Sequence, residues 1–469
     1  MAAETVSDLR KAFRSGKTKD IEYRIEQLTA LKKLINENVE ALTNAVFKDL
    51  GKCKTESMLF EIDMLETEIE ECLKNIYKWT APDYVSKTLM YKPMTCYINK
   101  EPLGVVLIIG AWNFPINLTL MPLIGAIVAG NCAIVKPSEI SPVTAHLLAE
   151  MVPKYLDQEC YRVVCGGVKE TTEILEERFD KIFYTGSGNV GKIAMTAAAK
   201  FLTPVVLELG GKNPAYVSDD ADLEITANRI AWAKFTNCGQ FCIAPDHIIC
   251  SKVVQDKLAN CLKESIESFY GTVVAKSPDY GRIVNERHFE RIEALLEDNC
   301  EIFFGGLRDK DTLFFSPTIL LNVSKDAKCM QDEIFGPILP IVTVESEEEA
   351  LEFVNSRPKP LSLYLFTSSG ERIRKWRNET SSGSFAANDC VIQGGLSTLP
   401  FGGVGPSGTG NYHGKFSFEA FTHQKSCLEA PLRLVEGANH RMRYPPYTER
   451  KLAWARWIIF GKGGSCNIL

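Results

Sequence analysis

Histidine is scarce in this sequence, and cysteine never occurs in the close pairs that bind metal ions. Six histidines are spread over 469 residues, and none of the 15 cysteines forms a Cys-x-x-Cys pair. Structural zinc sites are built from closely spaced cysteines and histidines, so we expect no metal site. The net charge of −6 supplies no general basic field, and no nucleic-acid partner is expected.

An apolar leader is also missing from the first residues. The chain begins Met1-Ala2-Ala3-Glu4, which is polar, and an odd number of cysteines does not indicate a disulfide framework. Both features predict reduced thiols in a cytosolic compartment. With 45% hydrophobic and 24% charged residues, the composition is that of a soluble globular protein, and the length predicts two or three domains.

Charged residues are absent from Pro102 to Val135, a run long enough to span a membrane. Glycine, proline and asparagine interrupt the run at positions 104, 110, 113, 115, 117, 122 and 131. These interruptions favour a buried strand over Val105–Ile109, a loop, a helix over about Leu118–Ala129 and a second strand over Cys132–Val135. We therefore interpret the run as the core of a folded domain rather than a membrane span.

Short apolar runs alternate with helical patterns along most of the chain. Residues 5–80 have the periodicity of long amphipathic helices. Strands are predicted at Val105–Ile109, Cys132–Val135, Arg162–Cys165, Lys181–Tyr184 and Pro204–Leu209. This alternation predicts an α/β fold in which helices cover a parallel sheet. A second α/β unit is expected over about 211–410, with helices near 221–235, 254–269 and 285–298 and strands near 338–343 and 361–366.

A candidate nucleophile lies in the sequence Gly239-Gln240-Phe241-Cys242, 34 residues after Glu208. A cysteine attacks a carbonyl as the thiolate, so it needs surroundings that lower its pKa or lend a base. A chain with 15 cysteines uses most of them as small buried hydrophobes, and this interpretation competes for Cys242. Cys238, four residues earlier, is an alternative position for the nucleophile.

Other short motifs surround this cysteine in the sequence. Each is weak alone and has a structural interpretation as a turn, a loop or a surface carboxylate. They are Ala111-Trp112-Asn113-Phe114-Pro115, Lys136-Pro137-Ser138-Glu139, Gly186-Ser187-Gly188-Asn189-Val190-Gly191-Lys192, Glu208-Leu209-Gly210-Gly211-Lys212, Glu333-Ile334-Phe335-Gly336-Pro337 and Leu399-Pro400-Phe401-Gly402-Gly403-Val404.

In this order and spacing the motifs resemble the aldehyde dehydrogenase superfamily over about 100–428. The length and the segment Phe201–Gly211 resemble the class 3 branch, and the C-terminus resembles its lipid-anchored B-type members. The resemblance implies the aldehyde dehydrogenase fold, with a Rossmann-like cofactor domain and an α/β catalytic domain. The implied divisions are 1–82 with 102–208 for the cofactor domain, 209–410 for the catalytic domain, 83–101 with 411–428 as extended segments of a small bridging sheet in a homodimer, and 429–469 as a basic, aromatic tail.

The resemblance also implies a mechanism for oxidising aldehydes to carboxylic acids. Cys242 would be the nucleophile, and the Asn113 side-chain amide with the Cys242 backbone N–H would form the oxyanion hole. A thioester would form and be hydrolysed by water that Glu208 activates. Glu333 matches the position that holds the nicotinamide ribose, and in class 3 enzymes it could share the role of base.

The cofactor implied by the family is NAD, with NADP as the alternative. Lys136 and Glu139 match contacts to the adenosine ribose, and a carboxylate there repels a 2′-phosphate. Glycines 186, 188 and 191 have the spacing of a Rossmann turn, which is weak evidence as a bare pattern. The family places this loop, with Ser187 and Val190, beside the pyrophosphate at a helix N-terminus. Phe335 belongs to the same nicotinamide motif as Glu333.

One residue departs from the class 3 pattern. Those proteins usually have a small residue, often threonine, directly before the cysteine, whereas this chain has Phe241. An aromatic side chain beside the nucleophile is expected to narrow the substrate channel or to extend its apolar wall. The chemistry is unaffected by this change, but the substrate preference cannot be carried over from the family.

The final residues, Cys466-Asn467-Ile468-Leu469, match a prenylation box in which a terminal leucine favours geranylgeranyl. Six basic residues and one acid lie between Arg441 and Lys462, together with Trp454 and Trp457. These features predict attachment to the cytoplasmic face of a membrane or to a lipid droplet, and hence medium- to long-chain fatty aldehydes as substrates. An inert tail is the alternative.

Two other functions are compatible with the same fold. A coenzyme A-acylating relative would release the thioester to a thiol, and the presence of Glu208 argues against it. A non-enzymatic, membrane-tethered scaffold would not need Asn113, Glu208, Cys242 and Glu333 together.

Overall fold

A computed structural model of the chain describes residues 2–296, 301–431 and 444–460. It contains two compact units, Met1–Asn75 with Leu103–Phe421, and Ile76–Pro102 with Thr422–Leu469. The first unit contains two large sheets, and the second a three-stranded sheet.

The first large sheet has the strand order β17-β7-β6-β3-β4-β5. Its parallel strands are β3 (Val105–Ile109), β4 (Cys132–Lys136), β5 (Tyr161–Val163), β6 (Lys181–Thr185) and β7 (Val205–Glu208). The short strand β17 (Gly408–Thr409) pairs antiparallel with β7, although it comes from the segment expected in the other domain. Parallel strands place their carboxyl ends at one edge, where ligand-binding loops gather.

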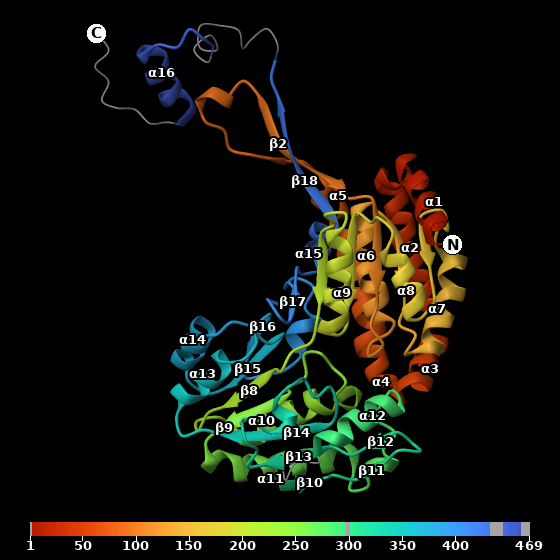
Figure 1. Cartoon of the computed structure of the whole chain (residues 1–469), viewed down its shortest axis with the longest axis vertical. Coiled ribbons are helices and arrows are strands. Elements are labelled where there is room, and N and C mark those ends of the chain that lie inside the picture. Colours follow the sequence, from red (N-terminus) through yellow and green to blue (C-terminus); the bar gives the residue numbers. More distant parts are fainter. Residues whose placement is uncertain (1, 297–300, 432–443, 461–469) are drawn as a thin grey trace. The chain divides into compact units, whose positions relative to one another are not determined.

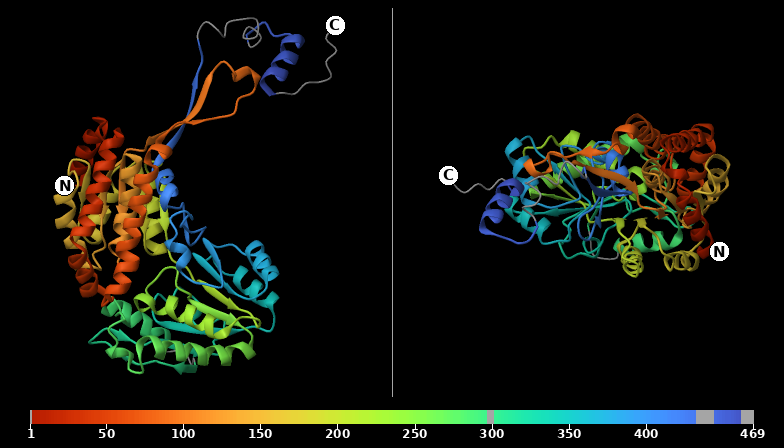
Figure 2. Two further views of the ribbon diagram at one scale, coloured as in Figure 1. Left: turned by 180° about the vertical axis from the view of Figure 1, so that it is seen from behind. Right: turned by 90° about the horizontal axis from the view of Figure 1, so that it is seen from above.

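Helices cover this sheet, and the strands β3, β4 and β6 are buried along their whole length. The N-terminal helices, red to orange in Figures 1 and 2, lie beside α6 and α7. The helices of this part are α1 (Ala2–Arg14), α2 (Ile21–Glu37), α3 (Val39–Leu50), α4 (Lys54–Ser57), the π-helical turn η2 (Met58–Ile62), α5 (Asp63–Thr80), α6 (Asn117–Ala129), α7 (Pro142–Tyr155), α8 (Val168–Leu175), α9 (Gly188–Ala199) and α15 (Gly414–Ala420).

The uncharged run 102–135 forms the strand β3, a loop, the helix α6 and the strand β4, as predicted. Every residue of α6 is buried, and so is every residue of both strands. Among the described residues, no helix combines the length and the apolar character that crossing a membrane requires. The apolar sequence therefore serves packing in the protein core.

The second large sheet has the order β10-β13-β14-β9-β8-β15-β16. Its strands are β8 (Pro214–Val217), β9 (His247–Cys250), β10 (Glu301–Phe304), β13 (Thr318–Leu321), β14 (Ile338–Thr343), β15 (Ser362–Phe366) and β16 (Ser384–Ala387), and only β10 is antiparallel to its neighbour. The ribbon β11 (Arg308–Asp309) and β12 (Phe314–Phe315) lies apart from this sheet. The helices are α10 (Leu223–Phe235), α11 (Lys252–Tyr270), α12 (Glu286–Glu293), α13 (Glu347–Asn355) and α14 (Gly370–Glu379).

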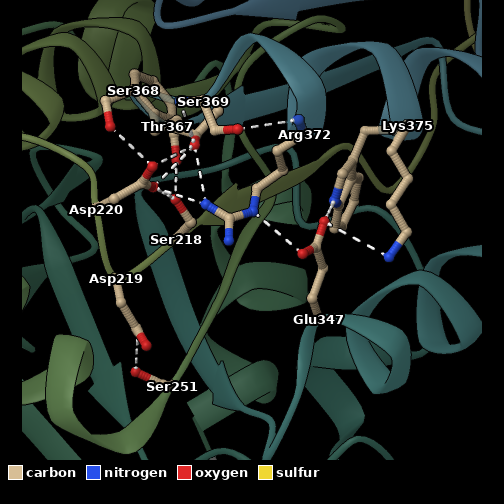
Figure 3. A network of polar contacts seen from close by, with 12 residues as sticks. Ser218, Asp219, Asp220, Ser251, Glu347, Thr367, Ser368, Ser369, Arg372 and Lys375 are labelled. Atoms are coloured by element: carbon tan, nitrogen blue, oxygen red, sulfur yellow. Dashed lines mark hydrogen bonds and ion pairs between the residues drawn. The ribbon is translucent and has the colours of Figure 1, made fainter.

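Polar side chains fix two of these helices to the carboxyl ends of β8 and β15 (Figure 3). Arg372 donates to Asp220 at 2.8 Å and to Glu347 at 3.1 Å, which joins α14 to α13 and to the loop after β8. Trp376 stacks on Tyr216 with ring centroids 4.4 Å apart and donates its indole N–H to Glu347. The polar groups in this cluster are hydrogen-bonded to one another, so the cluster stabilises the packing of α13 and α14 rather than forming a binding site.

The second unit is built on the pairing of strands from the two ends of the sequence. Strand β2 (Thr95–Pro102) pairs antiparallel with β18 (Thr422–Glu429) in an unbroken register from Thr422 opposite Pro102 to Glu429 opposite Thr95. The orange and blue strands run side by side in both views (Figures 1 and 2). Strand β1 (Asp83–Tyr84) pairs with the other side of β2, so β18 is an edge strand. Helix α16 (Glu449–Phe460) contacts the turn η3 (Leu89–Tyr91).

The prediction of extended chain over 411–428 is wrong for its first part. Residues Gly414–Ala420 form the helix α15, and the strand β18 begins only at Thr422. The start of α15 is held by Glu68, whose two carboxylate oxygens accept from the Gly414 N–H at 2.7 and 2.8 Å. This contact spans 346 residues of sequence, so the local pattern does not reveal it. The predicted strand Arg162–Cys165 is also displaced and runs over Tyr161–Val163.

Candidate active site

Cys242 lies where two cavities of the first unit meet. One cavity has a volume of about 520 Å³ and is mostly apolar, whereas the other, of about 500 Å³, contains buried carboxylates and a glycine-rich loop. The residues common to both cavities are Leu118, Cys242, Phe401 and Tyr412. A thiol at such a junction is accessible to one molecule from each side.

The loop that carries Cys242 has an unusual backbone. After α10, residues Asn237 and Cys238 adopt left-handed conformations with φ of 51° and 55°, and Gly239 follows with φ of 73°. A Cβ atom on Gly239 would lie 2.3 Å from the Gly336 carbonyl oxygen, so a glycine is required there. Left-handed non-glycine residues are strained and persist only where their surroundings hold them.

Gln240 supplies much of that support. Its side-chain amide donates to the Asn237 carbonyl at 3.1 Å and to the Arg282 carbonyl at 2.9 Å, and its side-chain oxygen accepts from the Val284 N–H at 3.0 Å. The Asn237 N–H donates to Glu56 at 2.9 Å. These contacts fix the backbone directly before the thiol and explain the glutamine in the motif.

The two neighbouring cysteines have different surroundings. Cys238 is fully buried, lines neither cavity and donates its thiol to the Tyr280 hydroxyl at 3.3 Å. Cys242 is only partly buried and faces both cavities. Burial, together with the charges of Glu333 and Glu208, holds the pKa of Cys242 well above its ordinary value. The thiol is therefore protonated at neutral pH in this state and needs a base before it can attack.

Asn113 extends from the loop after β3 toward the cysteine loop. Its side-chain amide donates to the Gln240 carbonyl at 3.1 Å, and an amide nitrogen has a second N–H to offer. Its backbone carbonyl accepts from Lys52 at 2.9 Å and from the Asn237 side chain at 2.8 Å. Asn113 lines the polar cavity with Cys242, as expected for a pair of groups that bind one carbonyl oxygen.

Glu208 lies at the end of β7 and is 3% exposed. Neither of its carboxylate oxygens has a hydrogen-bond partner among the described residues. Burial raises the pKa of Glu208 well above its ordinary value. A buried carboxyl group without protein partners is costly in a purely structural role, and this one lines the polar cavity that Cys242 also lines.

Glu333 approaches the same cavity from the segment that precedes β14. Burial and the nearby Asp246 raise the pKa of Glu333 to about 8. A Cβ atom on Gly210 would lie 1.9 Å from the Glu333 carboxylate, so that glycine allows the close approach. The segment is anchored by Lys212, which forms an ion pair with Asp246 and donates to the Asp332 carbonyl at 3.0 Å.

The glycine-rich loop lies at the N-terminus of α9. Ser187 caps this helix by accepting from the Val190 N–H at 3.5 Å. Gly186, Ser187 and Gly188 line the polar cavity, as does Phe335. Val190 and Gly191, in the first turn, do not line it, and Gly191 instead packs closely on Leu209.

Lys136 and Glu139 do not join these residues. They form an ion pair of 2.8 Å at the end of β4, with Lys136 buried and Glu139 largely exposed, and neither residue lines either cavity. The structure therefore brings together Asn113, Gly186, Ser187, Gly188, Glu208, Cys242, Glu333 and Phe335, and it leaves Lys136, Glu139, Val190 and Gly191 outside the cavities.

Sequence reasoning missed several residues of the polar cavity. Trp112 packs on His288, with ring centroids 4.9 Å apart, and on Phe335 at 5.3 Å. Burial, with Arg291 and Arg287 nearby, lowers the pKa of His288 to about 4, so its ring is neutral. The one available signal was the spacing of His288 and Arg291, which places both on one face of α12.

Aromatic side chains form the wall of the apolar cavity. The ring of Phe241 lies 4.5 Å from that of Phe114 and 5.7 Å from that of Phe60, and Trp232 completes the group. All four residues line the cavity. The Phe241 side chain is thus part of the apolar wall next to Cys242, and its effect on substrate preference stays a prediction.

The chain is similar to known proteins along nearly its whole length. A model described as the aldehyde dehydrogenase family matches residues 2–427. The sequence is 50% identical over 444 residues to the rat (Rattus norvegicus) protein "Aldehyde dehydrogenase, dimeric NADP-preferring", covering 95% of this chain and 97% of the relative. It is 48% identical over 469 residues to mouse (Mus musculus) "Aldehyde dehydrogenase family 3 member B3", covering 99% and 96%.

Solved structures show the same fold. The substrate-bound state of Staphylococcus aureus AldH matches with a TM-score of 0.93 and 43% identity, over 95% of this chain and 97% of that one. An indole-3-acetaldehyde dehydrogenase in complex with NAD+ matches with a TM-score of 0.84 and 26% identity, over 92% and 89%.

Proposed function

The chain belongs to the aldehyde dehydrogenase family, and we propose that it oxidises medium- to long-chain fatty aldehydes through a thioester on Cys242. It has the aldehyde dehydrogenase fold and is an NAD(P)-dependent aldehyde dehydrogenase. The observation that carries the proposal is the position of Cys242 at the junction of an apolar and a polar cavity. The aldehyde enters from the apolar side, and the dinucleotide occupies the polar side.

The first half of the reaction forms a bond between the Cys242 sulfur and the aldehyde carbon. The thiol gives up its proton to a carboxylate of the polar cavity, and the carbonyl oxygen becomes an oxyanion. The second N–H of the Asn113 amide and the Cys242 backbone N–H donate to that oxygen. Asn113 is prepared for this task because its other N–H is already bound to Gln240.

The second half breaks the carbon–sulfur bond with water. Glu208 accepts a proton from the water, whose oxygen attacks the thioester carbon. The carboxylic acid is released, and the sulfur of Cys242 remains as the thiolate. A base needs an available lone pair, and both carboxylate oxygens of Glu208 are without partners among the described residues. Glu333, with a pKa of about 8, is positioned to share this role.

The polar cavity has the features that a nicotinamide dinucleotide requires. Its volume of about 500 Å³ is within the range of cofactor sites, and backbone N–H groups of the twelve-residue helix α9 begin at its edge. We assign the pyrophosphate to Gly186–Gly188 and the nicotinamide ribose to Glu333 and Phe335. A dinucleotide held there would supply the acceptor for the hydride that the aldehyde carbon loses when the thioester forms. Lys136, Glu139, Val190 and Gly191 remain proposed contacts, within a cofactor domain of 1–82 and 102–208 beside a catalytic domain of 209–410.

The apolar cavity is the basis for the proposed preference for aldehydes with medium to long alkyl chains. Each buried methylene group contributes about 0.8 kcal/mol, so an alkyl chain seated among Phe60, Phe114 and Phe241 gains affinity with length. The test is NADH formation with aldehydes of increasing length. We expect kcat/KM to rise with each methylene until the cavity is filled, and a flat series would contradict the assignment.

The same assay separates the two rival functions. A coenzyme A-acylating enzyme would require coenzyme A for turnover, and a scaffold would form no NADH. Steady production of free carboxylic acid without coenzyme A is expected, because Glu208 is buried in the cavity that Cys242 lines.

The second unit supports two further assignments. The edge strand β18 has eight residues and, within the part of the chain that the structure describes, lies at the end of its sheet, which suits pairing with a second copy in a homodimer, testable by light scattering. Helix α16 exposes Leu452, Trp457 and Phe460 with the basic Arg456, which suits a membrane or lipid-droplet surface. Vesicle flotation should weaken in Trp457→Ala. The proposed prenylation site Cys466 lies outside the described residues and stays a prediction.

A further inference from the structure

A fully buried ion pair lies beneath the turn that carries Asn113. The Lys52 ammonium and the Glu61 carboxylate are 2.7 Å apart, and neither side chain has any exposed surface. Lys52 precedes α4, and Glu61 belongs to the π-helical turn η2. Neither residue lines either cavity.

Burying both charges is expensive, and an apolar pair of similar size often stabilises a fold equally well. A stability role alone therefore does not explain this pair. Its remaining contacts show what else it does, because almost all of them go to one short segment, residues 113–117.

The ammonium group of Lys52 has three donors and uses them in different directions. One donates to Glu61, and another donates to the Asn113 backbone carbonyl at 2.9 Å. The ammonium also lies 3.9 Å from the centre of the Phe114 ring. The backbone carbonyl of Asn113 is therefore held by the Lys52 ammonium, which cannot move without breaking its ion pair with Glu61.

The Glu61 carboxylate holds the other end of the same turn. Its second oxygen accepts from the backbone N–H groups of Ile116 and Asn117, each at 3.0 Å. These N–H groups lie at the start of α6, where a helix offers free donors. One ion pair thus holds the segment at a carbonyl, an aromatic ring and two N–H groups.

We propose that Lys52 and Glu61 are positioning residues for the reaction, which hold Asn113 so that its side-chain amide meets the substrate oxygen. The inference rests on the proposed role of Asn113 in binding that oxygen. The same carbonyl is also joined to the loop that leads to Cys242, because it accepts from Asn237, whose own N–H is bound by Glu56. Misplacing such a group by about 1 Å costs up to about 100-fold in rate.

The test is a double-mutant cycle read by rapid kinetics. The variant Lys52→Met/Glu61→Gln removes both charges together, so no unpaired charge remains. We expect the rate of the first NADH turnover to fall about 10- to 100-fold, with little change in the KM for the dinucleotide. In an Asn113→Ala background the same pair of substitutions should lower the rate of the first NADH turnover by less than about 2-fold beyond the effect of Asn113→Ala alone. The reason is that the pair acts through Asn113.

A matched control is Arg24→Met. Arg24 is also a buried cation, and it donates to the carbonyls of Thr18, Lys19 and Val128. This variant should lose thermal stability and keep the wild-type first turnover. An equal loss of first-turnover rate in Arg24→Met would assign the effect of the Lys52 pair to general destabilisation.

The milder variant Glu61→Asp keeps both charges and withdraws the carboxylate from Ile116 and Asn117 by one methylene group. It should also lower the rate of the first NADH turnover, by a smaller factor. If the double variant does not fold, this variant serves as the test. A folded pair variant with wild-type first turnover, or a loss that adds fully to that of Asn113→Ala, overturns the inference. If Asn113→Ala itself turns over normally, the proposed function of Asn113 fails instead.

Discussion

The side-chain amide of Asn213 donates to the backbone carbonyl of Cys242 at 2.8 Å. The same amide donates to the Ala244 carbonyl at 2.9 Å, while its oxygen accepts from the Ser362 N–H at 2.9 Å. Asn213 follows the Glu208-Leu209-Gly210-Gly211-Lys212 motif directly. One buried side chain therefore ties the segment of the expected base to the loop of the expected nucleophile.

Replacing Asn213 with alanine leaves two carbonyls of the cysteine loop without a donor. Each unsatisfied buried group costs about 1–3 kcal/mol, so the free energy of unfolding should fall by that order. We also expect kcat/KM to fall at least about 10-fold as Cys242 loses its fixed position. Asn213→Asp is a sharper variant, because it keeps the acceptor for Ser362 but cannot donate to Cys242. Wild-type kinetics in Asn213→Asp would show that these hydrogen bonds serve stability alone.

Cys242→Ser should lower dehydrogenase activity by more than about 10³-fold, whereas Cys238→Ser should leave most of it. Cys242 faces both cavities, and Cys238 is buried beside Tyr280 and faces neither. The measurement is NADH formation, combined with mass spectrometry of the acylated peptide. A comparable loss in a folded Cys238→Ser protein would move the nucleophile to that position.

Glu208→Gln should slow hydrolysis of the thioester far more than its formation. The glutamine has nearly the same shape but cannot accept a proton from water. Stopped-flow absorbance should show at most one equivalent of NADH per site, followed by very slow turnover. Turnover at the wild-type rate would assign the role of base to Glu333 or to another group.

Phe241→Thr should change the preference for chain length far more than the chemical step. The Phe241 ring packs on Phe114 and Phe60 in the apolar cavity, so its removal widens the wall next to the thiol. We expect the ratio of kcat/KM between long and short aldehydes to shift, with bulky or branched substrates gaining most. An unchanged ratio would mean that the substrate chain does not contact this ring.

Glu333 should make the stability of the free enzyme depend on pH. Burial raises the pKa of Glu333 to about 8, above the value of about 4.3 for an unfolded glutamate. A carboxyl group with a raised pKa favours the folded state at low pH, and this contribution is lost as the pH rises through 8. The melting temperature of Glu333→Gln should therefore improve relative to wild type between pH 6 and pH 9. A difference that stays constant over this range would contradict the assignment.

Much of the architecture could be predicted from the sequence. Strand β3 occupies the predicted residues Val105–Ile109, and α6 begins one residue before its predicted start. Such runs can be recognised in the sequence because an element that is buried on all sides needs an unbroken series of apolar residues. The order and spacing of the motifs along the chain also identified the family and its activity, and both predictions are confirmed.

What the sequence by itself determined was therefore most of the elements and the family, and it indicated which reactive groups to propose. Only the tertiary structure decided how those groups are held. The capping of α15 by Glu68, the support of Asn113 by Lys52 and the link from Asn213 to Cys242 join residues 29 to 346 positions apart. The physical reason is that periodicity and turn chemistry act over a few residues, whereas a buried hydrogen bond depends on where the folded chain brings its two ends together.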